Sequence, residues 1–94
     1  MGNGKWRILI PEKVIEEILS LPGSYPIRVR DAIAALSIPA PANFDFIKCR
    51  PGKDRWLEGK WRLKVGDYRV FVTPDMEKRT ILVNRVERRT STTY

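Results

Sequence analysis

The stretch KWRLKVGDYRV, residues 60–70, decides how this chain is expected to fold. Its cations Lys60, Arg62 and Lys64 alternate with apolar residues. Side chains on a strand point alternately to its two faces, so the three cations are expected to share one face and the apolar residues the other. The Gly66–Asp67 pair that follows is typical of a two-residue type II′ turn, with glycine first. The stretch therefore predicts a β-hairpin with one cationic and one apolar face.

A two-residue turn also fixes which residues of the two strands lie opposite one another. The expected pairs are Val65 with Tyr68, Lys64 with Arg69, Leu63 with Val70, Arg62 with Phe71 and Lys60 with Thr73. Phe71 is thus predicted to be an exposed aromatic residue on the cationic face. Like charges directly opposite each other destabilise a sheet, so an anionic ligand is expected to offset their repulsion. Cations interleaved with an aromatic ring suit single-stranded nucleic acid, which offers phosphates and stacking bases.

The rest of the chain places two helices between a first strand and a run of later strands. The expected elements are a strand over 5–10, helices over 11–21 and 26–36, and strands over 44–49, 60–65, 68–73 and 80–86. Helices segregated in sequence from most strands indicate an α+β fold, in which an N-terminal strand and an αα-hairpin pack on a small antiparallel β-sheet. We expect a single domain over residues 1–94, with a short basic tail over about residues 87–94.

Composition limits the chemistry that the chain can perform. The 94 residues include 18 Lys and Arg against 11 Asp and Glu, a formal net charge of +7, which favours a polyanionic partner, with nucleic acid ahead of membrane. There is no histidine, and Cys49 is the only cysteine, so neither an imidazole base nor a thiolate metal cluster is available. We expect no metal and no other cofactor. Nothing near Met1 is typical of a signal peptide, and a cytoplasmic location is expected.

The same residues resemble a known family. WRLKVGDYRVFV, followed by a charged turn, a last strand and a basic tail ending in tyrosine, resembles the RelE/ParE superfamily of small bacterial and archaeal toxins. The resemblance covers nearly the whole chain, including FDFIKCRPGKDRWLEGKWRLKVGDYRV and VNRVERR. Members similar to RelE are mRNA interferases, endoribonucleases that cut mRNA in the ribosomal A site and are inhibited by an antitoxin. The resemblance implies this activity, with the ribosome and mRNA as partners.

The resemblance also implies roles for individual residues. The residues it suggests for catalysis are Lys60, Arg62, Arg69, Arg88 and Tyr94. The cations and the aromatic ring of the hairpin, together with the basic residues near the tail, suggest a separate set for RNA binding: Lys64, Phe71, Arg85 and Arg89. Arg62 stands where RelE-type toxins carry the second of two lysines, and the tail arginine of the family matches either Arg88 or Arg89. Tyr94 lies further from these arginines than the family pattern has it.

The chemistry of RNA cleavage by its own 2′-hydroxyl explains why these residue types suit it. The 2′-oxygen must lose its proton, the phosphorane charge must be stabilised and the leaving oxygen must gain a proton. Arg69 suits the phosphorane, because a guanidinium stays charged and matches phosphate bidentately. Lys60 can act as the base, because neighbouring cations favour its neutral form. Arg62 is expected to grip phosphate, and a tail arginine or Tyr94 to act on the leaving group.

The resemblance implies a protein partner, and the sequence leaves two alternative functions open. A basic toxin calls for an acidic antitoxin, similar to RelB, that binds as an amphipathic helix. One alternative is a ParE-like protein that inhibits DNA gyrase by binding and catalyses nothing. The other is a degenerate toxin homologue that binds RNA without cleaving it, which the replacement of a lysine by Arg62 and the displaced Tyr94 would favour.

Overall fold

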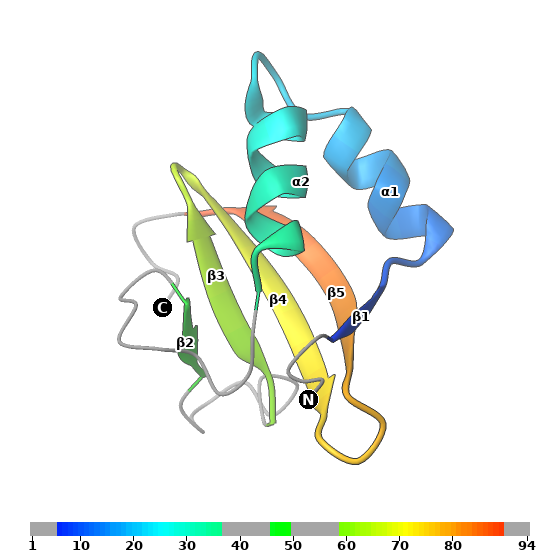
Figure 1. Ribbon diagram of the computed structural model, residues 1–94. Coiled ribbons are helices and arrows are strands. Elements are labelled where there is room, and N and C mark those ends of the chain that lie inside the picture. The colour runs from blue at the N-terminus through cyan, green and yellow to red at the C-terminus, as the bar shows by residue number, and fades with distance from the viewer. Residues whose placement is uncertain (1–5, 37–45, 50–58, 90–94) are drawn as a thin grey trace.

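Two helices cover one face of a five-stranded sheet in the computed structural model of the protein, which describes residues 6–36, 46–49 and 59–89 (Figure 1). The elements are β1 (Arg7–Leu9), α1 (Glu12–Leu19), α2 (Tyr25–Ala34), β2 (Phe46–Lys48), β3 (Trp61–Val65), β4 (Tyr68–Asp75) and β5 (Thr80–Arg88). The predicted α+β class with a helical hairpin on one face is confirmed.

The strand order is β1-β5-β4-β3-β2, which places β4 at the centre of the sheet. Strands β2 to β5 pair antiparallel with their neighbours, whereas β1 runs parallel to β5. The predicted small antiparallel sheet is therefore confirmed for β2 to β5, and the N-terminal strand joins this sheet in parallel. No turn joins β1 to its partner, because nearly the whole chain lies between them. Local alternation in a strand does not reveal the direction of such a distant neighbour.

The hairpin of β3 and β4 has the predicted register, with Val65 opposite Tyr68 and Lys64 opposite Arg69. Gly66 has a φ of 58°, while Asp67 is not among the residues of positive φ, as a type II′ turn requires. Both later strands run further than predicted. The pairing of β4 with β5 continues to Asp75 at one end and to Arg88 at the other.

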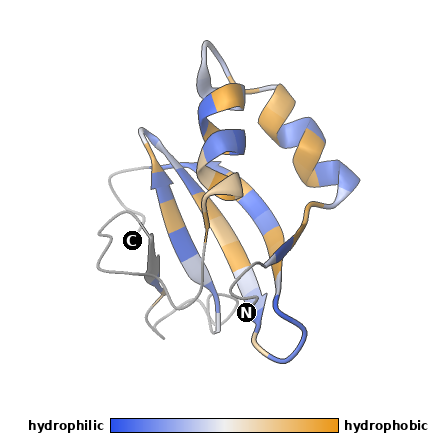
Figure 2. Cartoon of the chain, in the orientation of Figure 1, coloured by the Kyte–Doolittle hydropathy of each residue, from blue (hydrophilic) through white to orange (hydrophobic). Residues whose placement is uncertain are grey.

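The core lies between the helices and the sheet. Figure 2 shows apolar and polar residues alternating along β3 and β5, and a mostly apolar centre in β4. The buried residues of this core are Val14, Ile18, Val29, Ile33, Leu63, Val65, Val70, Val72, Ile81 and Val83. Trp6, Trp61 and Tyr25 are partly buried against it. This packing defines a helix-covered face and an opposite, helix-free face of the sheet.

The first residue of α2 holds the turn between β3 and β4. The Tyr25 hydroxyl accepts a hydrogen bond from the backbone N–H of Asp67, with an N–O distance of 3.1 Å. The Tyr25 ring also meets the Tyr68 ring edge-on, with centroids 4.6 Å apart. Because both contacts converge beside Gly66, a side chain at that position has no room. A Cβ built on Gly66 would lie 2.4 Å from the Tyr25 hydroxyl oxygen.

Gly66→Ala is expected to lower the free energy of unfolding by roughly 2–3 kcal/mol, since it combines a strained φ with this clash. For a domain of this size that corresponds to a melting temperature lower by about 10–20 °C. Gly59→Ala is the matched control, because Gly59 also has a positive φ, 76°, but a Cβ there meets no atom of the described residues within 4 Å. Comparing the melting temperatures of the two variants separates the cost of the clash with Tyr25 from the cost of a non-glycine residue at positive φ. Equal losses of stability would contradict the close approach of Tyr25.

Candidate nucleic-acid interface

Cationic side chains of three strands gather on the helix-free face of the sheet. The register places Arg62, Phe71 and Arg85 side by side in one row across β3, β4 and β5. Lys64 and Arg69 begin the next row. We call Lys60, Arg62, Lys64, Arg69 and Arg85 the cationic face. The structure thus brings together five of the cations that the sequence suggested.

A β-bulge in β5 puts Arg85 on this face. Phe71 lies opposite Arg85 in the register. Val72, the next residue, lies opposite Val83, so Asn84 is an extra residue in β5. Such an extra residue shifts the alternation of all following side chains by one position. Without the bulge, Arg85 would follow the buried Val83 onto the helix-covered face.

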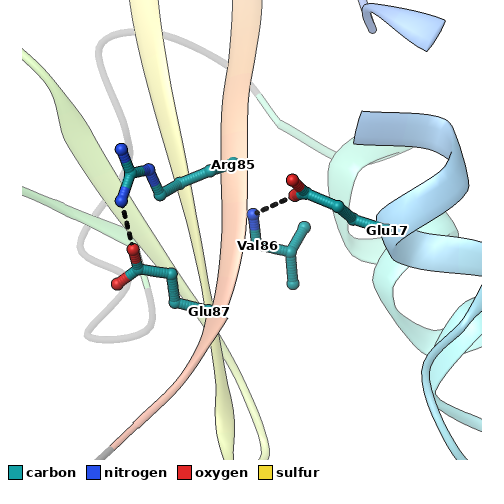
Figure 3. Close-up of polar contacts among 4 residues, drawn as sticks. All are labelled: Glu17, Arg85, Val86 and Glu87. Carbon is teal, nitrogen blue, oxygen red and sulfur yellow. Dashed lines mark hydrogen bonds and ion pairs between the residues drawn. The ribbon is translucent and has the colours of Figure 1, made fainter. Parts of the chain in front are cut away.

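Helix α1 holds the bulged strand from the other side (Figure 3). The Glu17 carboxylate accepts a hydrogen bond from the backbone N–H of Val86, at an N–O distance of 3.3 Å. Figure 3 shows Glu17 on one side of β5, and Arg85 and Glu87 on the other side, where they form an ion pair. Glu17 therefore satisfies a backbone donor just beyond the bulge that directs Arg85 and Glu87 onto the helix-free face.

Glu87 is a site residue that the sequence analysis missed. Its partner in the register is Arg69, so it completes the row of Lys64 and Arg69. Its side chain is 33% exposed and pairs with that of Arg85, which is 47% exposed. The sequence pattern places residue 87 in the tail, because the alternation of the last strand ends at Val86. Arg88 and Arg89, which follow, suggest a basic tail, so the sequence gives no sign that the carboxylate of Glu87 lies on the sheet.

Arg69 is buried and braces the turn. It is 6% exposed, and its Nη1 donates hydrogen bonds to the backbone carbonyls of Gly66 and Tyr68, both at 2.9 Å. A charged donor to two carbonyls stabilises the hairpin at the point where β3 turns into β4. Lys64 and Arg85 are exposed, while Lys60 and Arg62 are half-buried. The exposed part of the cationic face is therefore mainly on β3 and β5.

The predicted exposure of Phe71 is wrong. Phe71 is fully buried, at 0% exposed, although it lies on the helix-free face. It sits at the middle of the central strand, where its direct neighbours on both sides are Arg62 and Arg85. The aliphatic stems of long cationic side chains can cover apolar surface next to them. In this conformation Phe71 supports the cationic face from below and offers no ring for a base to stack on.

The tail residues separate from one another. Arg88 lies opposite Tyr68, which places it on the helix-covered face, away from the cationic face. Arg89 follows β5, is exposed, and donates its backbone N–H to the carbonyl of Asp67 at 2.7 Å. The predicted catalytic Tyr94 lies outside the described residues.

Cys49 borders the cationic face and is not activated by it. Its backbone N–H donates to the carbonyl of Lys60 at 2.9 Å. Burial raises the pKa of the Cys49 thiol, against the opposing effects of the Arg62 and Lys60 charges. The neutral thiol is therefore favoured, which does not suit a nucleophile.

Neither a metal centre nor a membrane span emerges from the described ranges. Within residues 6–36, 46–49 and 59–89, no three Cys, Asp or Glu side chains group as metal ligands would. Neither α1 nor α2 has the length and the apolar character that a bilayer-spanning helix needs.

Comparison with known proteins identifies the fold. No protein-family model and no curated protein sequence matches this chain. Two solved toxin–antitoxin complexes are similar. A chain of the archaeal RelE–RelB complex from Pyrococcus horikoshii OT3 is 26% identical, with a TM-score of 0.66 over 93% of this chain and 98% of that one. A chain of the RelBE2 complex from Mycobacterium tuberculosis is 20% identical, with a TM-score of 0.69 over the same shares, 93% and 98%. This chain therefore has a RelE-like toxin fold.

Proposed function

We propose that this protein is the toxin of a type II toxin–antitoxin system, an endoribonuclease that cleaves mRNA in the ribosomal A site through attack of the 2′-hydroxyl. The observation that carries the proposal is the cationic face, which the RelE-like fold presents on the side of the sheet away from the helices. Adjacent cations on neighbouring strands form a site for the phosphates of a single RNA strand.

The exposure of each cation suggests its part in this function. Lys64 and Arg85 are exposed enough to reach phosphates, and half-buried Arg62 can hold one bidentately. Lys60 is assigned to proton transfer. Among the tail arginines, Arg89 fits the site better than Arg88, because Arg88 shares the helix-covered face with Tyr68. Tyr94 stays a prediction for the leaving group.

The proposed partner is a cognate acidic antitoxin, similar to RelB, that binds as an amphipathic helix. The net charge of +7 complements an acidic chain. An apolar groove of about 230 Å³ between α1 and α2 suits the apolar face of such a helix. Three residues that line it are exposed: Ile15 at 42%, Leu19 at 70% and Ile27 at 57%. The two solved structures described above are both toxin–antitoxin complexes.

The test is to express the protein without an antitoxin and to map the 5′ ends of mRNA on translating ribosomes. Cleavage within A-site codons is expected, together with growth arrest that an acidic protein from the adjacent reading frame relieves. Arrest with intact mRNA and inhibited gyrase would instead support the ParE-like alternative, which no contact among the described residues specifically favours.

Replacing Lys60, Arg62 and Lys64 together by Gln is expected to weaken RNA binding and to flatten its salt dependence. Each phosphate that the variant no longer neutralises should reduce the slope of log affinity against log salt by about 0.7 for a single strand. A control with the same change of charge is the triple Gln variant of Arg30, Lys78 and Arg79, which lie in α2 and in the turn between β4 and β5. Filter binding of both variants and the parent is compared between about 50 and 200 mM salt, where counterion release is expected to change the affinity strongly. If log affinity falls with log salt at the same slope in both variants, the cationic face is not the RNA-binding surface.

A second candidate function, RNA binding without cleavage, is favoured by one observation. The Arg69 guanidinium, which the resemblance assigns to the phosphorane, is buried and bonded to the carbonyls of its own turn. If no other group replaces it in the transition state, the protein binds RNA and blocks translation without cutting. Ribosome binding at full affinity with uncut mRNA would establish this function.

A further inference from the structure

A polar hollow lies at the outer edge of β5, beside the cationic face. β1 pairs with β5 only from Thr80 to Leu82, so the strand edge beyond that point lacks a neighbouring strand in the described part of the sheet. The hollow there has a volume of about 330 Å³. Its lining residues are Lys13, Glu17, Asn84, Arg85, Val86 and Glu87. Its size is at the lower end of the range of ligand pockets, and its lining is charged where such pockets are usually apolar.

Glu87 and Glu17 are the two carboxylates in this hollow, and they are held differently. Glu17 is bonded to the backbone of Val86 and serves the fold. Glu87 projects from the opposite side of β5, next to Arg85 (Figure 3). In the register Glu87 also lies opposite Arg69, and Lys64 lies one strand further on. Neighbouring strands are about 4.8 Å apart, so Lys64 and Glu87 stand roughly 10 Å apart across the face, with Arg69 between them.

A carboxylate in a phosphate-binding face repels its ligand, so its position calls for a reason. Pairing with Arg85 is one, but a half-exposed ion pair contributes little to stability. A carboxylate between cations can, however, have another role. If the cations hold a phosphate of the RNA, the carboxylate is well placed to take a proton from the ribose hydroxyl next to that phosphate. The protein has no histidine for this task, and the Cys49 thiol is kept neutral by burial.

We propose that Glu87 is the general base of the cleavage reaction and that the hollow receives the ribose whose 2′-hydroxyl attacks. This inference rests on the proposed endoribonuclease function, and it transfers the role of base from Lys60 to Glu87. Lys13 and Arg85 line the same hollow and bind the phosphate that follows this ribose. The Arg85–Glu87 ion pair opens as that phosphate takes its place on Arg85.

The reaction then proceeds by transfer of one proton to the Glu87 carboxylate. The 2′-oxygen forms a bond to the adjacent phosphorus, and the bond from phosphorus to the 5′-oxygen breaks. The electron pair leaves with the 5′-oxygen, which takes a proton from solvent. The products are a 2′,3′-cyclic phosphate and a 5′-hydroxyl end, with no oxidant or metal required.

Glu87→Gln tests this role, because it keeps the shape of the side chain and removes the base. The rate of mRNA cleavage on ribosomes at saturating enzyme is expected to fall by roughly 100-fold or more. Affinity for an RNA analogue lacking the attacking 2′-hydroxyl is expected to stay the same or to rise, since a negative charge leaves the phosphate site. Glu77→Gln, in the exposed turn after β4, makes the same charge change away from the site and should cleave at the parental rate. Glu87→Asp, which keeps a carboxylate, should retain more activity than Glu87→Gln.

The possible outcomes are distinct. A folded Glu87→Gln protein that cleaves within about three-fold of the parent overturns the inference and leaves the proposed function standing, because one lost base should cost far more. Equal losses in the Gln and Asp variants, together with weaker binding of the analogue, also overturn it and assign Glu87 to positioning Arg85. A parental protein that never cleaves RNA overturns both the inference and the proposed function. Melting temperatures of all three variants show that folded proteins are being compared.

Discussion

Phe71→Ala is expected to lower the free energy of unfolding by about 3–5 kcal/mol, the usual cost of emptying a buried phenylalanine site. Among the described residues, Phe71 is the largest of the fully buried side chains, and it lies on the central strand of the sheet. A domain of this size has a total stability of only about 5–15 kcal/mol, so a large part of it is lost. Urea unfolding followed by tryptophan fluorescence gives the value.

Leu82→Ala is the matched control for Phe71→Ala. Leu82 lies on the same face of the sheet as Phe71 but is 38% exposed, so its removal should cost much less. The contrary hypothesis is that Phe71 is an exposed platform for an RNA base. Its removal would then leave stability nearly unchanged and weaken RNA binding by about 1–3 kcal/mol. That result would show that the burial of Phe71 does not persist in solution.

Arg69→Ala is expected to lower the free energy of unfolding by about 1.5–3 kcal/mol, because a charged donor to two backbone carbonyls disappears. In melting temperature this is a loss of roughly 6–20 °C. The acceptors are the carbonyls of Gly66 and Tyr68 on the two sides of the turn, so the hairpin itself loosens. Thermal unfolding and RNA cleavage must be measured on the same preparation, at a temperature where the variant is folded.

Lys64→Ala is the control that distinguishes the loss of the Arg69 hydrogen bonds from the loss of one positive charge on the cationic face. Lys64 lies directly opposite Arg69 on the same face but is exposed, so its removal should leave the melting temperature nearly unchanged. An Arg69→Ala protein of parental stability that cleaves roughly 100-fold more slowly would contradict the bracing role. Arg69 would then stabilise the phosphorane, as the resemblance to RelE-type toxins implied.

The sequence alone determined the hairpin of β3 and β4 in detail. Strict alternation over residues 60–65 and the Gly66–Asp67 pair specify both the faces and the register, because a two-residue turn leaves no freedom to slip. The amphipathic helices between the first strand and the rest likewise determined the α+β class. These features depend on neighbours a few residues apart along the chain.

Three features of the site depended on the tertiary structure. The parallel pairing of β1 with β5 joins distant parts of the chain, so no local pattern reveals it. The burial of Phe71 and Arg69 follows from the central place of β4, since alternation shows which residues share a face but not what lies over that face. The extra residue Asn84 shifts the alternation in β5. That single shift brings Arg85 and Glu87 to the cationic face and sends Arg88 to the other, because a strand of period two exchanges its faces with every residue inserted.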